Sequence, residues 1–233
     1  MKKKAFAVLQ TLVDFIFPRN CLGCESFLKF NEKHLCISCQ IKMPLTSFHL
    51  IREKPFYEKI NVQFESTAVT SLFFFQKEGA IAHMIHLFKY KGERKIGVFL
   101  GEWLANTLQE SSFFKDIDGI VPVPLHPKKQ KKRGYNQAEI VGATLSKKMG
   151  VPLYTEVLER IKNTTALALL GESARKNEVT NAFIQQQPFP TAPQHVLLID
   201  DVLTTGATLA ACASVLLKNS GLKISIAVLA CRL

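Results

Sequence analysis

The sequence lacks long hydrophobic runs and is short of acidic residues. No stretch approaches the roughly 20 uninterrupted apolar residues that a membrane-spanning helix needs. With 47% apolar and 21% charged residues, and only 12 glycines and 10 prolines in 233 positions, the composition excludes wholesale disorder, collagen and coiled coil. The length suits one full domain with a small appendage. Thirty Lys and Arg against nineteen Asp and Glu leave a net charge of +11, which favours polyanionic partners such as nucleic acid, nucleotides or an anionic membrane.

Residues 1–17 superficially resemble a secretory signal peptide. Gln10 and Asp14 interrupt the apolar run, however, and no small-residue cleavage site follows it. Four apolar residues instead have the spacing of one face of an amphipathic helix: Val8, Leu12, Phe15 and Ile16. A docking helix is the preferred interpretation over membrane association. We therefore expect a cytoplasmic protein without a membrane span, with the inner face of the membrane as the alternative location.

Four of the six cysteines form two C-x2-C pairs separated by eleven residues: Cys21, Cys24, Cys36 and Cys39. Each pair can aim both sulfur atoms at one point, and two pairs complete a tetrahedron around Zn²⁺. Four thiolates leave no open coordination position, so the metal is expected to be structural. A disulfide pair suits secreted chains, and two redox C-x-x-C motifs in so short a segment are uncommon. The pattern therefore predicts a zinc knuckle.

The chain divides into an N-terminal helix and knuckle over residues 1–50 and a main domain over residues 60–233, with residues 44–62 as a linker. Strands are expected over 66–75, 118–125, 195–202 and 224–233. Helices are expected over 78–92, 95–110 and 136–150, and a last helix, preceded by a loop and capped by Gly221, within 204–221. A basic loop is expected over 126–134. Strands that alternate with helices imply right-handed crossovers and a parallel sheet. The fold class is thus α/β.

The most informative stretch runs from Val196 to Thr208. A buried strand ends in two adjacent carboxylates, Asp200 and Asp201, at the position where open α/β sheets bind ligands. The turn that follows opens a helix whose first amide groups can bind an anion, and Gly206 lets the backbone approach a phosphate. The other candidate residues of this turn are Thr204, Thr205, Ala207 and Thr208. Paired carboxylates beside a phosphate site can accept hydrogen bonds from ribose hydroxyls or hold Mg²⁺.

This arrangement resembles the 5-phosphoribosyl-1-pyrophosphate (PRPP) fingerprint of type I phosphoribosyltransferases. Two more segments, VPVPLHPKKQKKRGYNQAE over 121–139 and FKYKG over 88–92, together with the knuckle, resemble the ComF family. The resemblance implies a parallel sheet flanked by helices, with a small N-terminal zinc-binding domain. It also implies that Asp200 and Asp201 meet the ribose hydroxyls, that residues 204–208 hold the 5′-phosphate, and that Mg²⁺ accompanies PRPP. ComF proteins are associated with the import of single-stranded DNA in natural transformation, in some bacteria with a DNA-translocating helicase as partner.

Thr204 occupies the position at which purine phosphoribosyltransferases carry an acidic general base. Threonine cannot take up a proton at neutral pH, so PRPP binding is better supported than phosphoribosyl transfer. No catalytic residue is assigned, and whether the chain is an enzyme stays open.

A basic segment precedes the third predicted helix and offers candidates for binding pyrophosphate or a DNA backbone. Its members are Lys128, Lys129, Lys131, Lys132, Arg133, Gly134, Tyr135, Asn136 and Gln137. Tyr135 and Tyr90 could stack on bases or simply pack. Three functions stay open: a competence protein that handles single-stranded DNA, an active phosphoribosyltransferase on an unidentified base, and a zinc-knuckle adaptor that docks to a helicase.

Overall fold

Four parallel strands form the central sheet, in the spatial order β1-β6-β5-β2. The computed structural model describes residues 19–51, 58, 66–162, 181–219 and 221–232, so the expected helix over residues 1–18 lies outside the described residues. The strands are β1 (Val69–Phe74), β2 (Gly119–Pro122), β5 (His195–Leu203) and β6 (Lys223–Cys231). The interiors of β5 and β6 are apolar and buried on both faces, as parallel strands between two helical layers must be. The predicted α/β fold is confirmed.

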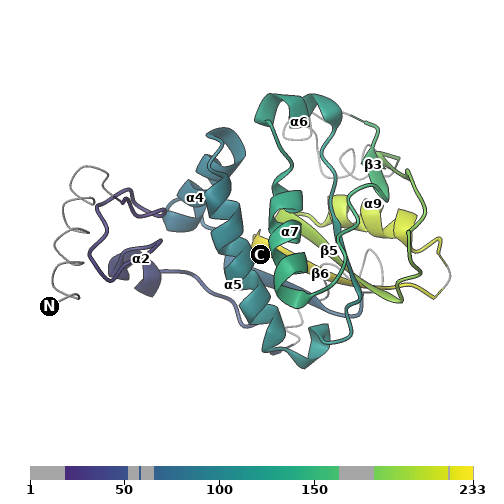
Figure 1. The fold of residues 1–233 in the computed structure, drawn as a ribbon, viewed down its shortest axis with the longest axis horizontal. Helices are drawn as coiled ribbons and strands as arrows, with labels where there is room; N and C mark the ends of the chain where they lie inside the picture. Colours follow the sequence, from purple (N-terminus) through teal and green to yellow (C-terminus); the bar gives the residue numbers. More distant parts are fainter. Residues whose placement is uncertain (1–18, 52–57, 59–65, 163–180, 220, 233) are drawn as a thin grey trace, which may run out of the picture.

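Helices cover both faces of this sheet (Figure 1). On one face lie α4 (Ala80–Tyr90), α5 (Arg94–Gln109) and α7 (Gln137–Met149), and on the other lies α9 (Ala207–Leu216). Alternate residues of β5 pack against the two helical layers. Leu197 and Ile199 pack in the apolar cluster with α4, α5 and α7, and Val196 and Leu198 pack in the cluster with α9. A short 3-10 helix, η1 (Ser112–Phe114), precedes β2. Within the described residues, no helix is both long and apolar enough to cross a membrane.

A second, antiparallel sheet was not expected from the sequence. It consists of β3 (Leu158–Arg160) and β4 (Phe183–Gln185), and it packs in the same apolar cluster as α9. Strands of three residues are too short to show an alternating pattern. This small sheet matters for function because it places Arg160 near the carboxyl end of β5.

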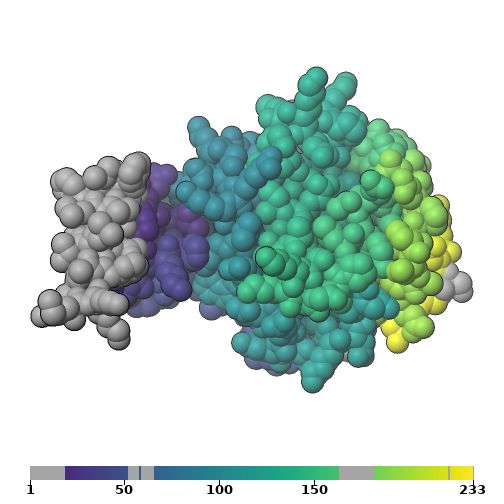
Figure 2. Space-filling view, in the orientation of Figure 1, coloured from purple at the N-terminus to yellow at the C-terminus, as the bar shows by residue number. Residues whose placement is uncertain are grey.

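The cysteine knuckle lies at one end of the molecule, beside α4 and α5 (Figure 2). It contains one short helix, α2 (Ile37–Ile41). Leu22 and Leu35 of the knuckle are buried in the same apolar cluster as Ile81 and Met84 of α4. The knuckle is therefore packed against the main domain by a shared core. The division into residues 1–50 and 60–233 stays a prediction.

Residues 44–51 are part of the packed structure, which corrects the expectation of a linker over 44–62. The backbone amide of Thr46 donates to the carbonyl of Leu72 over 3.1 Å, and Phe48 is buried with its ring edge-on to Phe74. The linker expectation rested on proline content. Pro44 lies within this packed segment, where its carbonyl accepts the amide of Phe74.

The basic segment is a helix, α6 (Pro127–Arg133), and the expected loop over 126–134 is wrong. Its local sequence explains the helix. His126 caps the first turn through Nδ1, which accepts the Lys128 amide over 3.2 Å, and Pro127 suits the first helical position. Gly134 ends the helix at φ 79°, a conformation that favours glycine. The cations in its last turn also interact favourably with the helix dipole.

The last helix is shorter than expected. α9 ends at Leu216 with Leu217 as its C-cap, so Gly221 does not cap it. The side-chain amide of Asn219 donates to the carbonyl of Leu216 over 2.8 Å, which satisfies one helix-terminal acceptor. Gly221 instead adopts φ 81° in the turn that leads into β6.

The contact between α4, α5 and α7 should not tolerate a side chain at Gly97. A Cβ there would lie 2.6 Å from Phe88 Cε2 and 2.9 Å from Ile140 Cγ2. Overpacking costs about 1–3 kcal/mol, against roughly 1 kcal/mol that alanine gains by helix propensity. Urea unfolding of Gly97→Ala should therefore show a net loss of up to about 2 kcal/mol. Val98→Ala, at an exposed neighbour, is the control; equal stability of the two variants would contradict the close packing.

Candidate functional site

The predicted phosphate site lies where β5 ends and α9 begins. The amide of Val123 donates to the carbonyl of Ile199 over 2.9 Å, which places the end of β2 beside Asp200. Gly206 adopts φ 80° and leads into α9, whose first amide, that of Ala207, lies 3.5 Å from Oγ1 of Thr205. Helix-start amides at the carboxyl edge of a parallel sheet can bind an anion. We call residues 200–208 the cradle.

The two carboxylates of the cradle differ in their surroundings. Burial and the adjacent charge of Asp201 raise the pKa of Asp200 to about 7, and the positive charges of Lys89 and Arg160 oppose this shift. One oxygen of Asp200 accepts the amide of Asp201 over 2.8 Å. Asp200 therefore exchanges a proton near neutral pH, which an exposed aspartate would not do.

Lys89 is a site residue that the sequence analysis did not assign. Its Nζ lies 2.8 Å from Oδ1 of Asp201, and both side chains are largely buried. The neighbouring residues contact the end of α6 and the segment after it: the carbonyl of Phe88 accepts the hydroxyl of Tyr135, and the Arg133 guanidinium lies 5.3 Å from the Tyr90 ring centroid. The FKYKG segment was the available signal. It is the last turn of α4, and it connects the cradle with α6.

Arg160 was also missed, and the sequence carried no signal for it. It ends β3, and its guanidinium lies 5.2 Å from the Phe183 ring centroid. Burial lowers the pKa of Arg160, while the negative charge of Asp200 raises it. The charges of Arg160 and Asp200 therefore act on each other across the carboxyl end of β5.

The cations of α6 point in two directions. Lys128, Lys131 and Lys132 are exposed, whereas Lys129 is half-buried. Burial and the positive charges of Arg160 and Arg133 lower the pKa of Lys129. Lys129 therefore faces the side of α6 that lies toward the cradle.

The residues after α6 hold the end of β2 in place. The Asn136 side chain donates to the carbonyl of Val123 over 3.0 Å and accepts the amide of Ala138, which caps α7. Arg133 donates to Oε1 of Gln137 over 2.9 Å. The segment from 128 to 137 thus lies beside the carboxyl end of β2, and its role in binding pyrophosphate or DNA stays a prediction.

Tyr135 is not available for base stacking, which corrects that part of the hypothesis. Its ring is 7% exposed, its hydroxyl donates to the carbonyl of Phe88, and the Arg94 guanidinium lies 4.8 Å from its centroid. Tyr135 is a packing residue. Tyr90, in contrast, is exposed.

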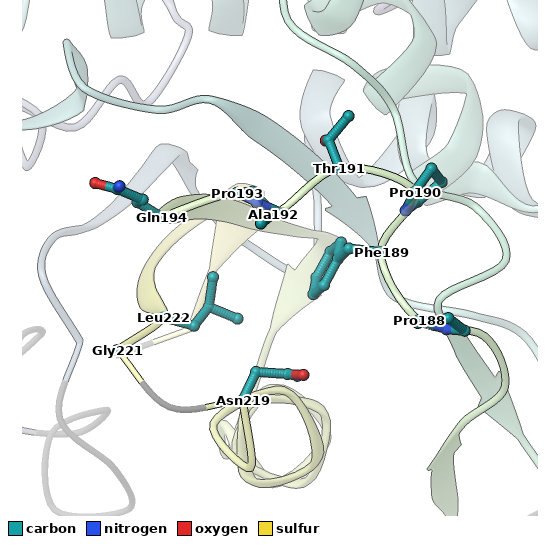
Figure 3. A pocket seen from close by; sticks show the side chains of 10 residues that line it. All are labelled: Pro188, Phe189, Pro190, Thr191, Ala192, Pro193, Gln194, Asn219, Gly221 and Leu222. Atoms are coloured by element: carbon teal, nitrogen blue, oxygen red, sulfur yellow. The ribbon is translucent and has the colours of Figure 1, made fainter.

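A hollow lies away from the cradle, on the side where β5 and β6 begin (Figure 3). It encloses about 690 Å³ between the loop Pro188–Gln194 and the segment from Asn219 to Leu222. Because parallel strands point the same way, this hollow is at the edge opposite the cradle. Among the described residues that line it, none carries a charged side chain.

The four knuckle cysteines converge as predicted. Their sulfur atoms all lie within 4.8 Å of one another, and the sulfurs of Cys24 and Cys36 are 3.7 Å apart. Tetrahedral zinc with Zn–S near 2.3 Å requires sulfurs about 3.8 Å apart. The amide of Cys36 donates to the sulfur of Cys21 over 3.3 Å, and Ser26 lowers the pKa of Cys24 to about 6. The cluster could therefore hold a metal such as zinc, which binds the deprotonated thiols.

Glu32 orders the loop between the two cysteine pairs. Its carboxylate accepts the amides of Lys29 and Ile37 over 2.6 and 2.8 Å, and these bonds lower its pKa. Arg19 donates to the carbonyl of Glu32 over 3.0 Å. Loop residues 29–37 are thus fixed by hydrogen bonds as well as by the cysteines.

Comparisons with known proteins agree with this picture. The phosphoribosyl transferase domain family matches residues 131–233. Competence protein F of Haemophilus influenzae is 27% identical over 208 residues, which span 83% of this chain and 88% of that protein. The DNA utilization protein YhgH of Escherichia coli K12 is 28% identical over 63% of this chain and 65% of its own length. Competence protein ComFC of Bacillus subtilis is 24% identical, with 85% and 78% covered.

A solved structure, adenine phosphoribosyltransferase of Leishmania tarentolae, covers 62% of this chain and 74% of its own, with 12% identity and a TM-score of 0.39. The fold assignment rests on the family match and on the parallel sheet. The chain therefore has a type I phosphoribosyltransferase fold with an N-terminal four-cysteine cluster. Within that class, its homologues are competence protein F, ComFC and YhgH. These homologues support the assignment of the chain to the ComF family.

Removal of one thiolate should empty the metal site. Protein purified under reducing conditions should contain one zinc per chain by elemental analysis, and Cys36→Ser should contain clearly less, because serine is not a thiolate ligand. Metal binding contributes folding free energy, so hydrogen exchange should rise over residues 19–43 while the main domain stays protected.

Ser38→Ala, an exposed change between two cysteines, should keep its zinc. Absence of metal from the wild-type protein would contradict the site.

Asp200 should make stability depend on pH in an unusual direction. Its folded pKa, about 7, lies above the unfolded value near 3.9, so the native state holds the proton longer. The free energy of unfolding should then fall as pH rises from about 4 to about 7 and level off above, by up to about 1.4 kcal/mol per pH unit. Urea unfolding of wild type and Asp200→Asn at each pH isolates this contribution.

In Asp201→Asn, loss of the neighbouring negative charge should lower the pKa of Asp200, so that the free energy of unfolding levels off at a lower pH than in wild type. Parallel pH profiles for wild type and Asp200→Asn would show that Asp200 titrates normally.

Proposed function

We propose that this protein handles single-stranded DNA during DNA uptake or utilisation, and that its cradle binds PRPP or another phosphorylated ribose together with Mg²⁺. One observation carries the proposal. The cationic helix α6 and the cradle lie at the same edge of the sheet, linked by the charges of Lys129, Arg160 and Asp200. The names of the homologues, competence protein and DNA utilization protein, support the DNA part.

The two orientations of the α6 lysines suit two anionic ligands. Lys129 is placed to meet the phosphates of a ligand in the cradle, because it faces Arg160. Lys128, Lys131 and Lys132 are exposed and free to contact the phosphates of a DNA strand, which supply most of the affinity of non-specific binding.

A cytoplasmic location and a DNA-translocating helicase as partner belong to the same proposal. None of the six cysteines forms a disulfide, which agrees with a reducing compartment. The helicase follows from the resemblance to the ComF family.

Phosphoribosyl transfer is a second candidate function, favoured by Asp200. A carboxyl with a pKa of about 7 can accept or donate a proton at neutral pH, which general acid–base catalysis requires. It lies within the PRPP fingerprint, where Thr204 cannot serve as a base.

Substitutions on the two faces of α6 should separate DNA binding from PRPP binding. In fluorescence-anisotropy titrations with a labelled oligonucleotide, affinity should fall with salt at about −0.7 per phosphate contact. Changing Lys128, Lys131 and Lys132 together to Gln should flatten that slope by about 2. Lys129→Gln should leave the slope nearly unchanged but weaken PRPP binding with Mg²⁺, measured by calorimetry, by on the order of 1.5 kcal/mol.

A matched control changes Lys115, Lys218 and Lys223 to Gln, because all three are exposed and lie toward the opposite edge of the sheet. No detectable DNA binding at low salt would overturn the DNA part. Equal PRPP affinity in wild type and a variant with Asp200 and Asp201 both changed to Asn would overturn the cradle assignment.

A further inference from the structure

A second pocket lies between the knuckle and α5, away from the cradle residues. It encloses about 460 Å³, within the range of about 300–1,000 Å³ that is usual for small-molecule sites. Its wall on one side is Phe99 and Trp103 of α5, and on the other side is the knuckle loop with Lys33 and His34. Segments that are some 60 residues apart in the sequence thus form one concave surface.

Three aromatic rings meet in this pocket. The His34 and Phe99 rings have centroids 4.7 Å apart and an interplanar angle of 31°, and the Phe99 and Trp103 centroids are 5.8 Å apart. The indole of Trp103 also packs edge-on against Phe73 of the central sheet, 5.2 Å away. The aromatic surface is therefore held by the core on one side and by an exposed histidine on the other.

The polar groups around these rings favour an anionic, planar ligand. Lys33 is an exposed cation, Asn31 offers an exposed amide, and among the described residues no carboxylate lines the pocket. Gln40 donates its Nε2 to the carbonyl of Leu35 over 2.8 Å, which leaves its side-chain oxygen as an acceptor. Aromatic faces with a nearby cation and amide groups are the features by which proteins hold the bases of a single strand.

α5 connects this pocket with the cationic helix. Arg94, at its start, donates to the carbonyl of Gly134, the residue that ends α6, over 3.2 Å. At 1.5 Å per residue, Phe99 and Trp103 follow roughly 8 and 14 Å further along α5. One extended strand could therefore contact α6 and the pocket together.

We propose that the pocket between the knuckle and α5 binds a nucleobase of single-stranded DNA, stacked on the His34, Phe99 and Trp103 surface with Lys33 beside the neighbouring phosphate. This inference rests on the proposed function, because it names where a bound strand would place a base.

The chain contains one tryptophan, so tryptophan emission reports on this pocket alone. The zinc-loaded full chain is titrated with oligothymidylate of about 12 nucleotides, a length within the usual site size. The emission of Trp103 should be quenched as the strand binds, while an abasic strand of the same length and charge binds without quenching. Thymidine monophosphate at high concentration should quench as well, since it offers the same base with one phosphate.

His34→Ala should weaken oligothymidylate binding roughly five- to tenfold with little change in salt slope, because stacking is insensitive to salt. Lys33→Ala should lower the salt slope by about 0.7. Phe99→Leu should abolish most of the quenching of Trp103. Lys115→Ala is the matched control for Lys33→Ala, and Phe113→Leu is the matched control for Phe99→Leu. Zinc content and urea unfolding verify that each variant is folded.

Two outcomes overturn the pocket assignment: binding by anisotropy with unchanged Trp103 emission, or equal quenching by the abasic strand. Absence of strand binding overturns the proposed function instead. In that case, saturable quenching by thymidine monophosphate would support a nucleotide pocket, and its absence would overturn the pocket as well.

Discussion

The site is organised by one electrostatic constraint: two adjacent carboxylates at the end of a strand that is buried on both faces. Burial and the adjacent charge of Asp201 destabilise the charged form of Asp200, and cations from other elements oppose this effect. Lys89 reaches Asp201 from α4, and the charge of Arg160 on β3 acts on Asp200. The acid pair therefore links α4 and the small antiparallel sheet to the carboxyl end of β5. A ligand that brings Mg²⁺ or ribose hydroxyls to these carboxylates would compete with Lys89 for Asp201.

The helical form of the basic segment decides how its charges act. Lys128, Lys131 and Lys132 have the spacing i, i+3 and i+4 and are all exposed, whereas Lys129, about 100° around the helix from Lys128 and about 60° from Lys132, is half-buried. A flexible loop would present the same cations without this separation. The helix therefore makes two roles compatible in seven residues: one face can contact a long polyanion while the other faces the cradle. The choice between pyrophosphate and DNA, which the sequence left open, need not be exclusive.

Sequence patterns predicted the features that depend on local or repeated signals. The apolar runs of β5 and β6 and the spacing of the cysteines were sufficient for the sheet and the cysteine cluster, while the cradle as a phosphate site stays a prediction. Arg160 could not be found, because a lone arginine in a three-residue strand becomes significant only through the tertiary packing that brings it near Asp200. The burial of Tyr135 likewise depends on its contact with Phe88, 47 residues away. The α6 helix was recoverable in principle, since Pro127 and Gly134 are ordinary helix boundaries, but its charge density suggested a loop.

A metal held by the four cysteines would also support the proposed base pocket, because the same cysteines flank the loop that lines it. The two cysteine pairs fix both ends of the loop that carries Lys33 and His34, and the carboxylate of Glu32 binds the amides at positions 29 and 37 within it. The loop thereby keeps a defined position against Phe99 without any ligand of its own. Since the knuckle shares an apolar cluster with α4, and the last turn of α4 holds Asp201, the metal cluster and the cradle are supported by the same helix. The cysteine cluster is thus best understood as part of the scaffold that positions both surfaces, rather than as a separate appendage.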